Sequence, residues 1–239
     1  MRFLDLTYPT PAENLACDEA LLDQCDDRSG DEALRFWESP EHFVVLGFSG
    51  RLRDEVREEV CAARGIPVLR RVSGGGTVVQ GPGVLNYAVV IRPGPAHEAS
   101  SVRGAHRFVL GRAADVLASL TGEEVKLEGD SDLAIAGRKI SGNAQRRRGR
   151  AVLVHGTILL GLDLALVEDL LPLPGRAPEY RETRGHLAFL RNLNLNRDDV
   201  KQKLRKAWDA DEEAMAPTPE RMKLLVELKY GTESWRGRR

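Results

Sequence analysis

The spacing of apolar residues predicts helices that are distributed along the whole chain. The longest pattern covers residues 100–120, where apolar side chains recur at the three- and four-residue intervals of one helical face. Near the amino terminus, Thr10-Pro11-Ala12-Glu13 has the residues of a capping box with proline at the first helical position, and predicts a helix that runs to about residue 26. Further helices are predicted at residues 54–64, 163–171, 198–208 and 218–228, followed by a frayed basic end at Arg236, Arg238 and Arg239.

Short apolar runs bounded by turn residues predict strands between these helices. The runs at 33–37 and 42–47 are separated by Ser39-Pro40-Glu41 and resemble a hairpin, and those at 133–135 and 138–140 predict a tighter hairpin around Ala136-Gly137. A chain of 239 residues accommodates one large domain, or a main domain with a small appendage. The other predicted strands lie at residues 3–6, 67–71, 77–80, 84–91, 123–127 and 152–160.

Composition and charge narrow the functional classes. The chain has 35 Lys and Arg residues against 36 Asp and Glu residues and a formal net charge of -1, which gives no overall reason to expect nucleic acid or an anionic membrane as partner. No apolar run reaches membrane-spanning length, and Asp5 comes too early for a secretory signal, so we expect a cytoplasmic protein. Cys17, Cys25 and Cys61 are odd in number and lack C-x-x-C spacing, which argues against a disulfide framework and a structural zinc site.

A run of three glycines marks the least ordinary stretch of the sequence. Residues 70–87 read R-R-V-S-G-G-G-T-V-V-Q-G-P-G-V-L-N-Y, and consecutive glycines cost conformational entropy without burying a side chain. Gly74, Gly75 and Gly76 let a ligand lie against backbone N–H groups, and Arg70 and Arg71 suit a carboxylate or phosphate. The alternative is a glycine-rich hairpin turn with two solvated arginines. The stretch matches neither the P-loop nor the dinucleotide-binding motif.

A second candidate element occupies residues 132–148, D-L-A-I-A-G-R-K-I-S-G-N-A-Q-R-R-R. Alternation along the second strand of the predicted hairpin places Lys139 and Ile140 on opposite faces, with Ile140 in the core. A lysine on a strand is usually solvated. Lys139, however, lies between the turn at Gly137 and the small residues around Gly142, where a ligand has access to its ammonium group. We therefore interpret Lys139 as a ligand-binding cation, with a solvated side chain as the alternative.

Other polar positions have plainer interpretations. His155 lies in the apolar run at 152–160 and is expected to be a hydrogen-bonded core histidine, because no Ser/His/Asp or metal-ligand spacing surrounds it. We expect Asp18 and Glu19 of the first helix to be solvated, and leave them outside the candidate site. The polar run at 180–184 is interpreted as surface charge.

The motifs R-R-V-S-G-G-G-T-V, G-R-K-I-S-G-N-A-Q and H-G-T-I-L-L occur in this order and resemble the lipoate-protein ligase A and octanoyltransferase family, which shares its catalytic domain with biotin protein ligases. The resemblance extends from E-N-L-A-C-D-E-A-L-L at residues 13–22 to Y-R-E-T-R-G-H at 180–186. The biotin branch carries a G-R-G-R-x-x-R-G loop instead of R-R-V-S-G-G-G, so biotin is disfavoured. The family implies an α+β fold with a mixed, largely antiparallel sheet flanked by helices, related to class II synthetases. It also implies a catalytic domain at residues 1–210 and a short C-terminal helical extension at 211–239.

The resemblance also implies a chemistry. Ligases of this family activate lipoate with Mg-ATP as an acyl-adenylate and pass the acyl group to a lysine of a lipoyl carrier domain, so ATP, Mg²⁺ and lipoate or octanoate are the implied substrates, with no structural metal. Lys139 matches the lysine that holds the carbonyl and phosphate oxygens of the activated acyl group. Asp132 is a candidate for a magnesium, ribose or amine group, although such an aspartate is more often a turn cap. The other residues that the resemblance assigns to the acyl-adenylate site are Arg71, Ser73, Gly74, Gly75, Gly76, Thr77, Asn86, Gly142, Asn143, Ala144, His155, Gly156 and Thr157.

Departures from the family pattern bear on the activity. Gln80 occupies a position where many members have histidine, so a role borrowed from that histidine does not carry over. Larger bacterial ligases have an accessory C-terminal domain that helps adenylation, and only residues 219–239 are left here to serve in its place. This difference raises the expectation of a separate accessory protein.

The sequence leaves three functions open. The first is the ATP-dependent ligase, the second a transferase that takes octanoate or lipoate from an acyl carrier or a pre-formed acyl-adenylate, and the third a non-catalytic lipoyl-binding protein. Transferases of the family use a cysteine nucleophile, and none of the cysteines lies in the three motifs, which favours the ligase. Lys139 counts against a pure binder, which has less need of a cation at the acyl carbonyl.

Overall fold

Two β-sheets form the frame of the protein, whose computed structural model describes residues 1–238. The strands are β1 (Arg2–Asp5), β2 (Ala33–Trp37), β3 (Phe43–Leu46), β4 (Val68–Arg70), β5 (Val78–Gln80), β6 (Val84–Ile91), β7 (Lys126–Glu128), β8 (Asp132–Ile135), β9 (Arg138–Arg148), β10 (Ala151–Leu159) and β11 (Glu212–Glu213). The larger sheet has the order β11-β1-β2-β6-β10-β9-β8-β7 and the smaller has the order β4-β3-β5. Within the described residues the parallel pairs are β11 with β1, β1 with β2, and β3 with β4. The prediction of a mixed, largely antiparallel sheet is therefore confirmed.

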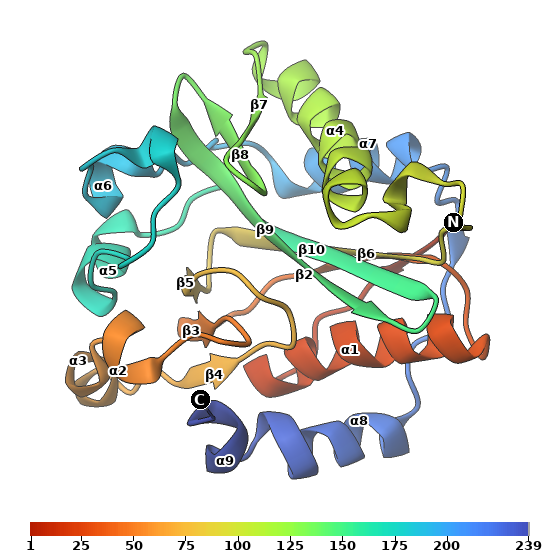
Figure 1. Cartoon of the computed structure of the whole chain (residues 1–239), viewed down its shortest axis with the longest axis horizontal. Coiled ribbons are helices and arrows are strands. Elements are labelled where there is room, and N and C mark those ends of the chain that lie inside the picture. Colours follow the sequence, from red (N-terminus) through yellow and green to blue (C-terminus); the bar gives the residue numbers. More distant parts are fainter. Residues whose placement is uncertain (239) are drawn as a thin grey trace.

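Helices cover both faces of the larger sheet (Figure 1). They are α1 (Pro11–Asp27), α2 (Leu52–Glu55), α3 (Glu58–Ala63), α4 (Val102–Thr121), α5 (Leu164–Leu170), α6 (His186–Phe189), α7 (Arg197–Ala207), α8 (Pro219–Leu225) and α9 (Glu233–Arg236). One apolar core lies between the sheet and α4 with α7, and a second lies between the opposite sheet face and α1 with α8. Strand β6 serves both cores because alternate side chains point to opposite faces: Tyr87 and Val89 enter the first, and Ala88 and Val90 the second.

The first helix begins as predicted, but its polar face is not solvated. The Thr10 side chain accepts a hydrogen bond from the Glu13 N–H, and the Glu13 carboxylate accepts one from the Thr10 N–H, which completes the capping box. Asp18 and Glu19 are only 2% and 7% exposed, so the expectation that they face water was wrong. Both have partners far away in the sequence that apolar periodicity does not reveal. Asp18 pairs with a buried arginine of β2, and Glu19 binds the C-terminal segment.

Two local predictions fail because strand partners and helix breaks depend on packing. The runs at 33–37 and 42–47 do not form a hairpin, since β2 pairs with β1 and β6 while β3 pairs with β4 and β5 in the smaller sheet. The helix predicted at 54–64 is divided into α2 and α3 by Val56, whose backbone is extended. Val56 is buried in the core of the smaller sheet, a position that a continuous helix would not provide.

The C-terminal residues pack on the elements that lead to the glycine run. Glu19 on α1 accepts hydrogen bonds from Lys229 at 2.7 Å and from the Tyr230 hydroxyl at 2.8 Å. The Trp235 indole N–H donates to the Arg70 carbonyl at 2.8 Å, while the buried Arg70 guanidinium donates to the carbonyls of Trp235 and Arg236. The predicted fraying was thus wrong for Arg236 and also for Arg238, whose guanidinium lies over the rings of Phe48 and Trp235, and Arg239 lies outside the described residues.

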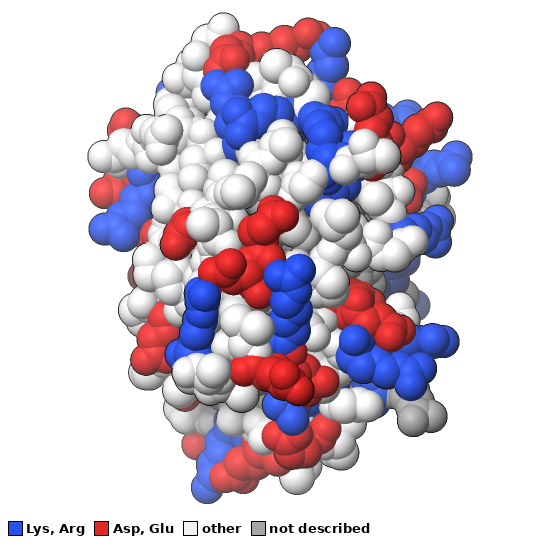
Figure 2. Space-filling view, turned by 90° about the vertical axis from the view of Figure 1, so that its left-hand side faces the viewer, with Lys and Arg blue, Asp and Glu red and all other residues white. Residues whose placement is uncertain are grey.

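Charged side chains are distributed evenly over the outer surface that Figure 2 shows, where basic and acidic groups are interspersed. This face therefore does not divide into an acidic half and a basic half. No helix within residues 1–238 combines the length and the apolarity needed to cross a bilayer.

We expect Trp235→Ala to destabilise the protein by about 2 kcal/mol, because it removes a half-buried indole that packs against Phe48 and Tyr230 and donates to Arg70. The free energy of unfolding in urea measures this change. Leu228→Ala, in the same C-terminal segment but at a side chain that is 71% exposed, is the matched control and should shift stability by less than about 0.5 kcal/mol. Equal stability of the two variants would contradict the assigned role of the C-terminal segment.

Candidate active site

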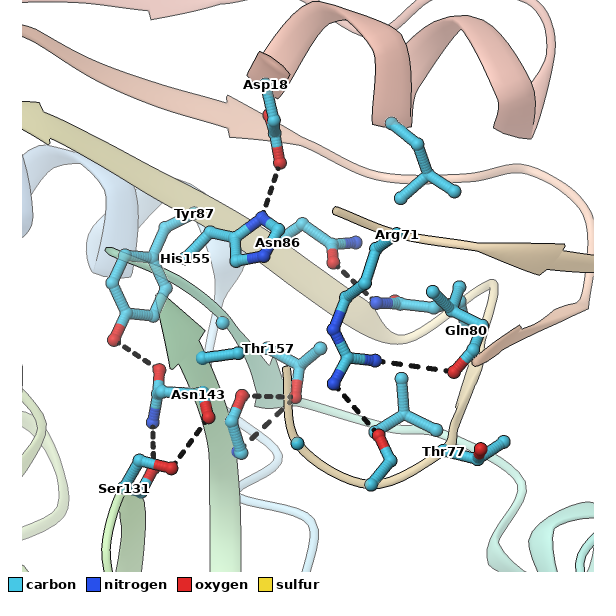
Figure 3. A pocket seen from close by; sticks show the side chains of 18 of the residues that line it. Asp18, Arg71, Thr77, Gln80, Asn86, Tyr87, Ser131, Asn143, His155 and Thr157 are labelled. Atoms are coloured by element: carbon cyan, nitrogen blue, oxygen red, sulfur yellow. Dashed lines mark hydrogen bonds and ion pairs between the residues drawn. The ribbon is translucent and has the colours of Figure 1, made fainter. Parts of the chain in front are cut away.

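A pocket of about 140 Å³ lies between the larger sheet, the first turns of α1 and the smaller sheet with the glycine run (Figure 3). The register of the sheet explains which side chains form its floor. Gly142 of β9 is opposite Thr157 of β10, and Thr157 is opposite Asn86 of β6, so these three lie in one row on the face that α1 covers. The remaining lining residues are Leu15, Asp18, Trp37, Val45, Arg71, Gly75, Gly76, Thr77, Val78, Gln80, Tyr87, Ser131, Asp132, Lys139, Asn143, Ala144, His155 and Gly156.

Most of the residues predicted for the site therefore meet in one pocket. Ser73 and Gly74 are exceptions, since they lie beside the lining and not in it. Ser73 has no exposed surface and is held behind His155. Lining residues that the sequence did not single out are chiefly apolar or small. Among them, Leu15 and Asp18 lie within the E-N-L-A-C-D-E-A-L-L stretch, and Val78 and Tyr87 lie within residues 70–87.

Arg71 shapes the glycine run from within. Its guanidinium donates to the carbonyl oxygens of Gly74 at 2.5 Å and Gly76 at 2.9 Å, and its Nε donates to the Ser73 hydroxyl at 3.1 Å. Burial lowers the pKa of Arg71 to about 10, with Glu55 opposing the shift, so the side chain remains charged at neutral pH. Arg71 was predicted to meet a ligand anion, and most of its donors are instead used to hold the loop.

The same arrangement leaves the loop's own donors free. None of the backbone N–H groups from Gly74 to Thr77 has a hydrogen-bond acceptor within residues 1–238. Successive unpaired N–H groups in a loop form a site suited to an anion. Gly75 needs its glycine because its φ is +86°, whereas a Cβ on Gly74 or Gly76 would meet no other atom within 4 Å. Protein packing therefore does not explain why Gly74 and Gly76 lack side chains, which fits a ligand that approaches them.

Lys139 lines the same pocket from β9 of the larger sheet, whereas the glycine run connects β4 and β5 of the smaller sheet. Its ammonium is 2.8 Å from the Asp132 carboxylate, and its side chain is 22% exposed, so it does not extend into bulk solvent. Ile140 is fully buried on the other sheet face, as the alternation predicted. The lysine lies across Gly142, where a Cβ would be only 2.8 Å from its Nζ. Gly142 thus gives the ammonium group its path to the pocket.

Asp132 is held between two partners. One carboxylate oxygen is paired with Lys139 and the other accepts a hydrogen bond from the Tyr180 hydroxyl at 2.9 Å. The segment at 180–184 is therefore part of the site's support and not merely surface charge, and Arg181 within it is buried. Residues 1–238 contain no group of three or more His, Cys, Asp or Glu side chains that could hold a metal. A magnesium ion that arrives with nucleotide phosphates needs only one or two carboxylates, for which Asp132 stays a candidate.

Asn143 and Gly156 belong to the wall beneath this pair. The Asn143 side chain accepts from the Tyr87 hydroxyl at 2.6 Å and donates to the Ser131 carbonyl at 2.9 Å. A Cβ on Gly156 would lie 1.8 Å from the Asn143 side-chain oxygen, so Gly156 has to be glycine for this network to form. Asn143 of the S-G-N motif and Gly156 of the H-G-T motif therefore stabilise the pocket wall.

Gln80 and Asn86 leave polar atoms unpaired inside the pocket. The Gln80 amide donates to the Asn86 side-chain oxygen at 2.7 Å, while Gln80 Oε1 and Asn86 Nδ2 are buried without a partner in the described chain. Unpaired buried polar atoms cost free energy unless a ligand or water completes them. Gln80 therefore lines the pocket, although the sequence assigned it no role.

None of the cysteines lines this pocket. Cys17, Cys25 and Cys61 are all buried. Burial raises the pKa of the Cys17 thiol to about 12 and that of Cys25 to about 11, which keeps both in the unreactive thiol form. The pocket walls therefore provide no thiolate nucleophile.

Comparison with known proteins agrees with this geometry. The family model of the lipoyl protein ligase A/B catalytic domain matches residues 10–209. The chain belongs to this family. The matched region contains every residue of the pocket and ends before β11, α8 and α9.

The curated relatives of this chain are named for two different activities. A relative from Aeropyrum pernix, provisionally named lipoate-protein ligase A, is 34% identical over 70% of this chain, and the match spans only 60% of that protein. Octanoyltransferase LipM of Geobacillus kaustophilus is 30% identical over 77% of the chain and 73% of its own length. LipM of Moorella thermoacetica is also 30% identical, over 75% of the chain and 72% of its length.

Solved structures show the same fold. A structure described as a bi-partite lipoate protein ligase with its E2 lipoyl domain, from Thermoplasma acidophilum, has a TM-score of 0.81 and 26% identity, and covers 99% of this chain and 96% of that one. A lipoate-protein ligase A bound with ATP has a TM-score of 0.84 at 24% identity, covering 99% and 98%. The α+β fold of the lipoate ligases is thereby confirmed.

We expect Gly74→Ala and Gly76→Ala to fold normally and yet to lower acyl transfer at least about ten-fold in kcat/KM, because each Cβ enters open space, in the pocket lining at Gly76 and beside it at Gly74. Thermal unfolding and steady-state transfer rates measure the two effects. Gly111→Ala on α4 is the matched control: it too meets no atom within 4 Å, lies outside the pocket, and should leave transfer unchanged. Wild-type rates in both loop variants would contradict ligand approach at these glycines.

Proposed function

We propose that the protein is a lipoate-protein ligase that activates lipoate or octanoate with Mg-ATP and transfers the acyl group to a lysine of a lipoyl carrier domain. The observation that carries this proposal is the pairing of one ammonium group with a row of free N–H groups in a single pocket. Lys139 comes from β9 of the larger sheet, and the unpaired N–H groups belong to Gly74 to Thr77 in the loop between β4 and β5. Such a pair suits an acyl phosphate anhydride, in which a carbonyl and a phosphate are adjacent.

In the activation step, a carboxylate oxygen of the acid attacks the α-phosphorus of ATP and pyrophosphate leaves. Negative charge then lies on phosphate oxygens, for which the loop N–H groups and Lys139 are the available donors. Lys139 has three N–H donors and gives one to Asp132, so two remain for oxygens of the substrate. Asp132 is the carboxylate that would share the magnesium ion.

In the transfer step, the carrier amine attacks the acyl carbonyl, and AMP leaves with the bonding electrons of the C–O bond. Lys139 would stabilise the oxyanion that develops on the carbonyl. Because two nearby ammonium groups repel, Lys139 also favours the neutral, nucleophilic form of the incoming lysine. Because the Lys139 side chain is only 22% exposed, water screens both effects less than it would at an open surface.

The proposed partners are taken from a protein of the same fold. The Thermoplasma acidophilum structure includes an E2 lipoyl domain, and its description as bi-partite supports a second protein in adenylation. We extend both to this chain: a lipoyl carrier domain as acyl acceptor, and a separate accessory protein that completes adenylation.

The second candidate is octanoyl transfer from a carrier, the activity named for LipM relatives. A transferase that passes its acyl group through a thioester needs an accessible thiolate. The three cysteines are buried and none of them lines the pocket, so the structure favours the ligase.

Mass spectrometry of a purified lipoyl carrier domain separates these functions. The domain is incubated with this protein and lipoate, with and without Mg-ATP, and in parallel with an octanoylated acyl carrier in place of lipoate and ATP. We expect acylation that requires Mg-ATP, with the accessory protein added if the single chain is slow. Acylation only from the octanoylated carrier would identify a transferase, and acylation in neither mixture would identify a binding protein.

Lys139→Ala should lower the rate of transfer by about 100- to 1000-fold, the usual effect of removing one donor from a developing oxyanion. Carrier acylation under saturating substrates measures the loss, and circular dichroism checks the fold. Lys126→Ala on β7, where the side chain is 58% exposed, is the control and should have no effect. Transfer by the Lys139 variant within about three-fold of wild type would rule out this role.

A further inference from the structure

A chain of five buried polar side chains connects α1 and β2 to the glycine run. The Arg35 guanidinium lies 2.5 Å from one Asp18 oxygen, and the other Asp18 oxygen is 2.9 Å from His155 Nδ1. His155 Nε2 is 2.6 Å from the Ser73 hydroxyl, which accepts from Arg71 Nε at 3.1 Å. Each of the five residues is less than a tenth exposed. Arg71, Ser73 and His155 were predicted for the site one by one, but their connection to Asp18 and Arg35 could not be predicted because these two residues lie more than 30 positions away in the sequence.

The hydrogen bonds in this chain have one consistent direction. Burial alone would raise the pKa of the Asp18 carboxyl, but the Arg35 guanidinium and the His155 ring together lower it below its usual value, so Asp18 is ionised and can only accept. His155 Nδ1 therefore carries a proton, and we assign Nε2 of the neutral ring as the acceptor of the Ser73 hydroxyl. Ser73 receives a hydrogen bond from Arg71 and has its own proton free for Nε2. Each bond from Arg71 through Ser73 and His155 to Asp18 thus has one donor and one acceptor, while Arg35 Nε has no partner in the described chain.

The arrangement resembles a Ser-His-Asp triad, yet it is not built for nucleophilic attack. Ser73 has no exposed surface and does not line the pocket, so its hydroxyl has no access to an acyl carbonyl. Its neighbour Arg71 instead carries the connection onward to the carbonyls of Gly74 and Gly76. The end of the chain is the loop with the free N–H groups.

We propose that Asp18 and His155 are positioning residues that hold the glycine run, through Ser73 and Arg71, in the shape that binds the phosphate of an acyl-adenylate. This inference rests on the proposed function. Peptide carbonyl and N–H groups point in opposite directions, so fixing the carbonyls of Gly74 and Gly76 also fixes the directions of the N–H groups of Gly75 and Thr77. The imidazole must remain in the Nδ1–H tautomer for Ser73 to stay oriented toward it.

The proposal is tested by binding, independently of turnover. Isothermal calorimetry measures the Kd of a non-hydrolysable acyl-sulfamoyl-adenosine for wild type, Ser73→Ala, Asp18→Asn and the double variant. Asn at 18 has the shape of Asp but can donate to Nδ1, which allows the wrong histidine tautomer. We expect each single variant to bind about ten-fold more weakly, since one hydrogen-bonded link of the chain is lost. The double variant should bind about as weakly as either single one, because both changes break the same chain.

Asn14→Ala is the matched control. The Asn14 side chain also binds the Arg35 guanidinium, at 2.8 Å, but it lies off the path to the loop. This variant should lose stability in thermal unfolding and keep the wild-type Kd. A folded Ser73 or Asp18 variant with wild-type affinity, or a double variant that is about a hundred-fold weaker, would overturn the positioning role. Failure of the wild-type protein itself to bind the analogue would refute the proposed function, and this inference with it.

Discussion

The grip of the Arg71 guanidinium on the carbonyls of Gly74 and Gly76 is the interaction on which the site depends. A run of glycines has little conformational preference of its own, so something outside the run must fix its shape. Arg71 does so from a buried position, with charge-assisted hydrogen bonds that are stronger than those between neutral groups. Because Arg71 binds carbonyl groups of the loop, it leaves the N–H groups of the loop without a partner among the described residues.

The rest of the fold can be understood as support for this loop and for the lysine that faces it. Strand β4 ends at Arg70 and Arg71 follows it directly, while the C-terminal segment fixes Arg70 through Trp235 and Arg236. On the other side, β8 and β9 deliver Asp132 and Lys139, whose path crosses Gly142. The two halves of the site are therefore built by separate sheets, and α1 joins them.

The sequence predicted those parts of the site that depend on local chemistry. The unusual glycines, the alternation that separates Lys139 from Ile140, and the capping box at Thr10 are all properties of neighbouring residues. It did not predict the burial of Asp18 and Glu19, because their partners lie on β2, β10 and the C-terminal segment. An acidic residue on a helix looks the same in sequence whether it faces water or a buried arginine.

The same reason explains the errors in the fold. Strands β2 and β3 have entirely buried side chains, so no polar alternation shows which sheet each one joins, and the short connection between them suggested a hairpin. Arg71 was assigned to the ligand because a charged group beside glycines has that role in many anion sites. Arg71 does line the pocket, but it also donates to carbonyl groups within five residues, a contact that depends on the fold of the loop and not on its composition.

The most direct test of the account is a crystal structure of the protein with a non-hydrolysable acyl-adenylate analogue. We predict the group that replaces the phosphate within about 2.7–3.2 Å of backbone N–H groups of Gly74 to Thr77, and the acyl carbonyl oxygen within the same range of Lys139 Nζ. An analogue bound elsewhere, or bound in this pocket with both the loop N–H groups and Lys139 out of hydrogen-bonding range, would contradict it.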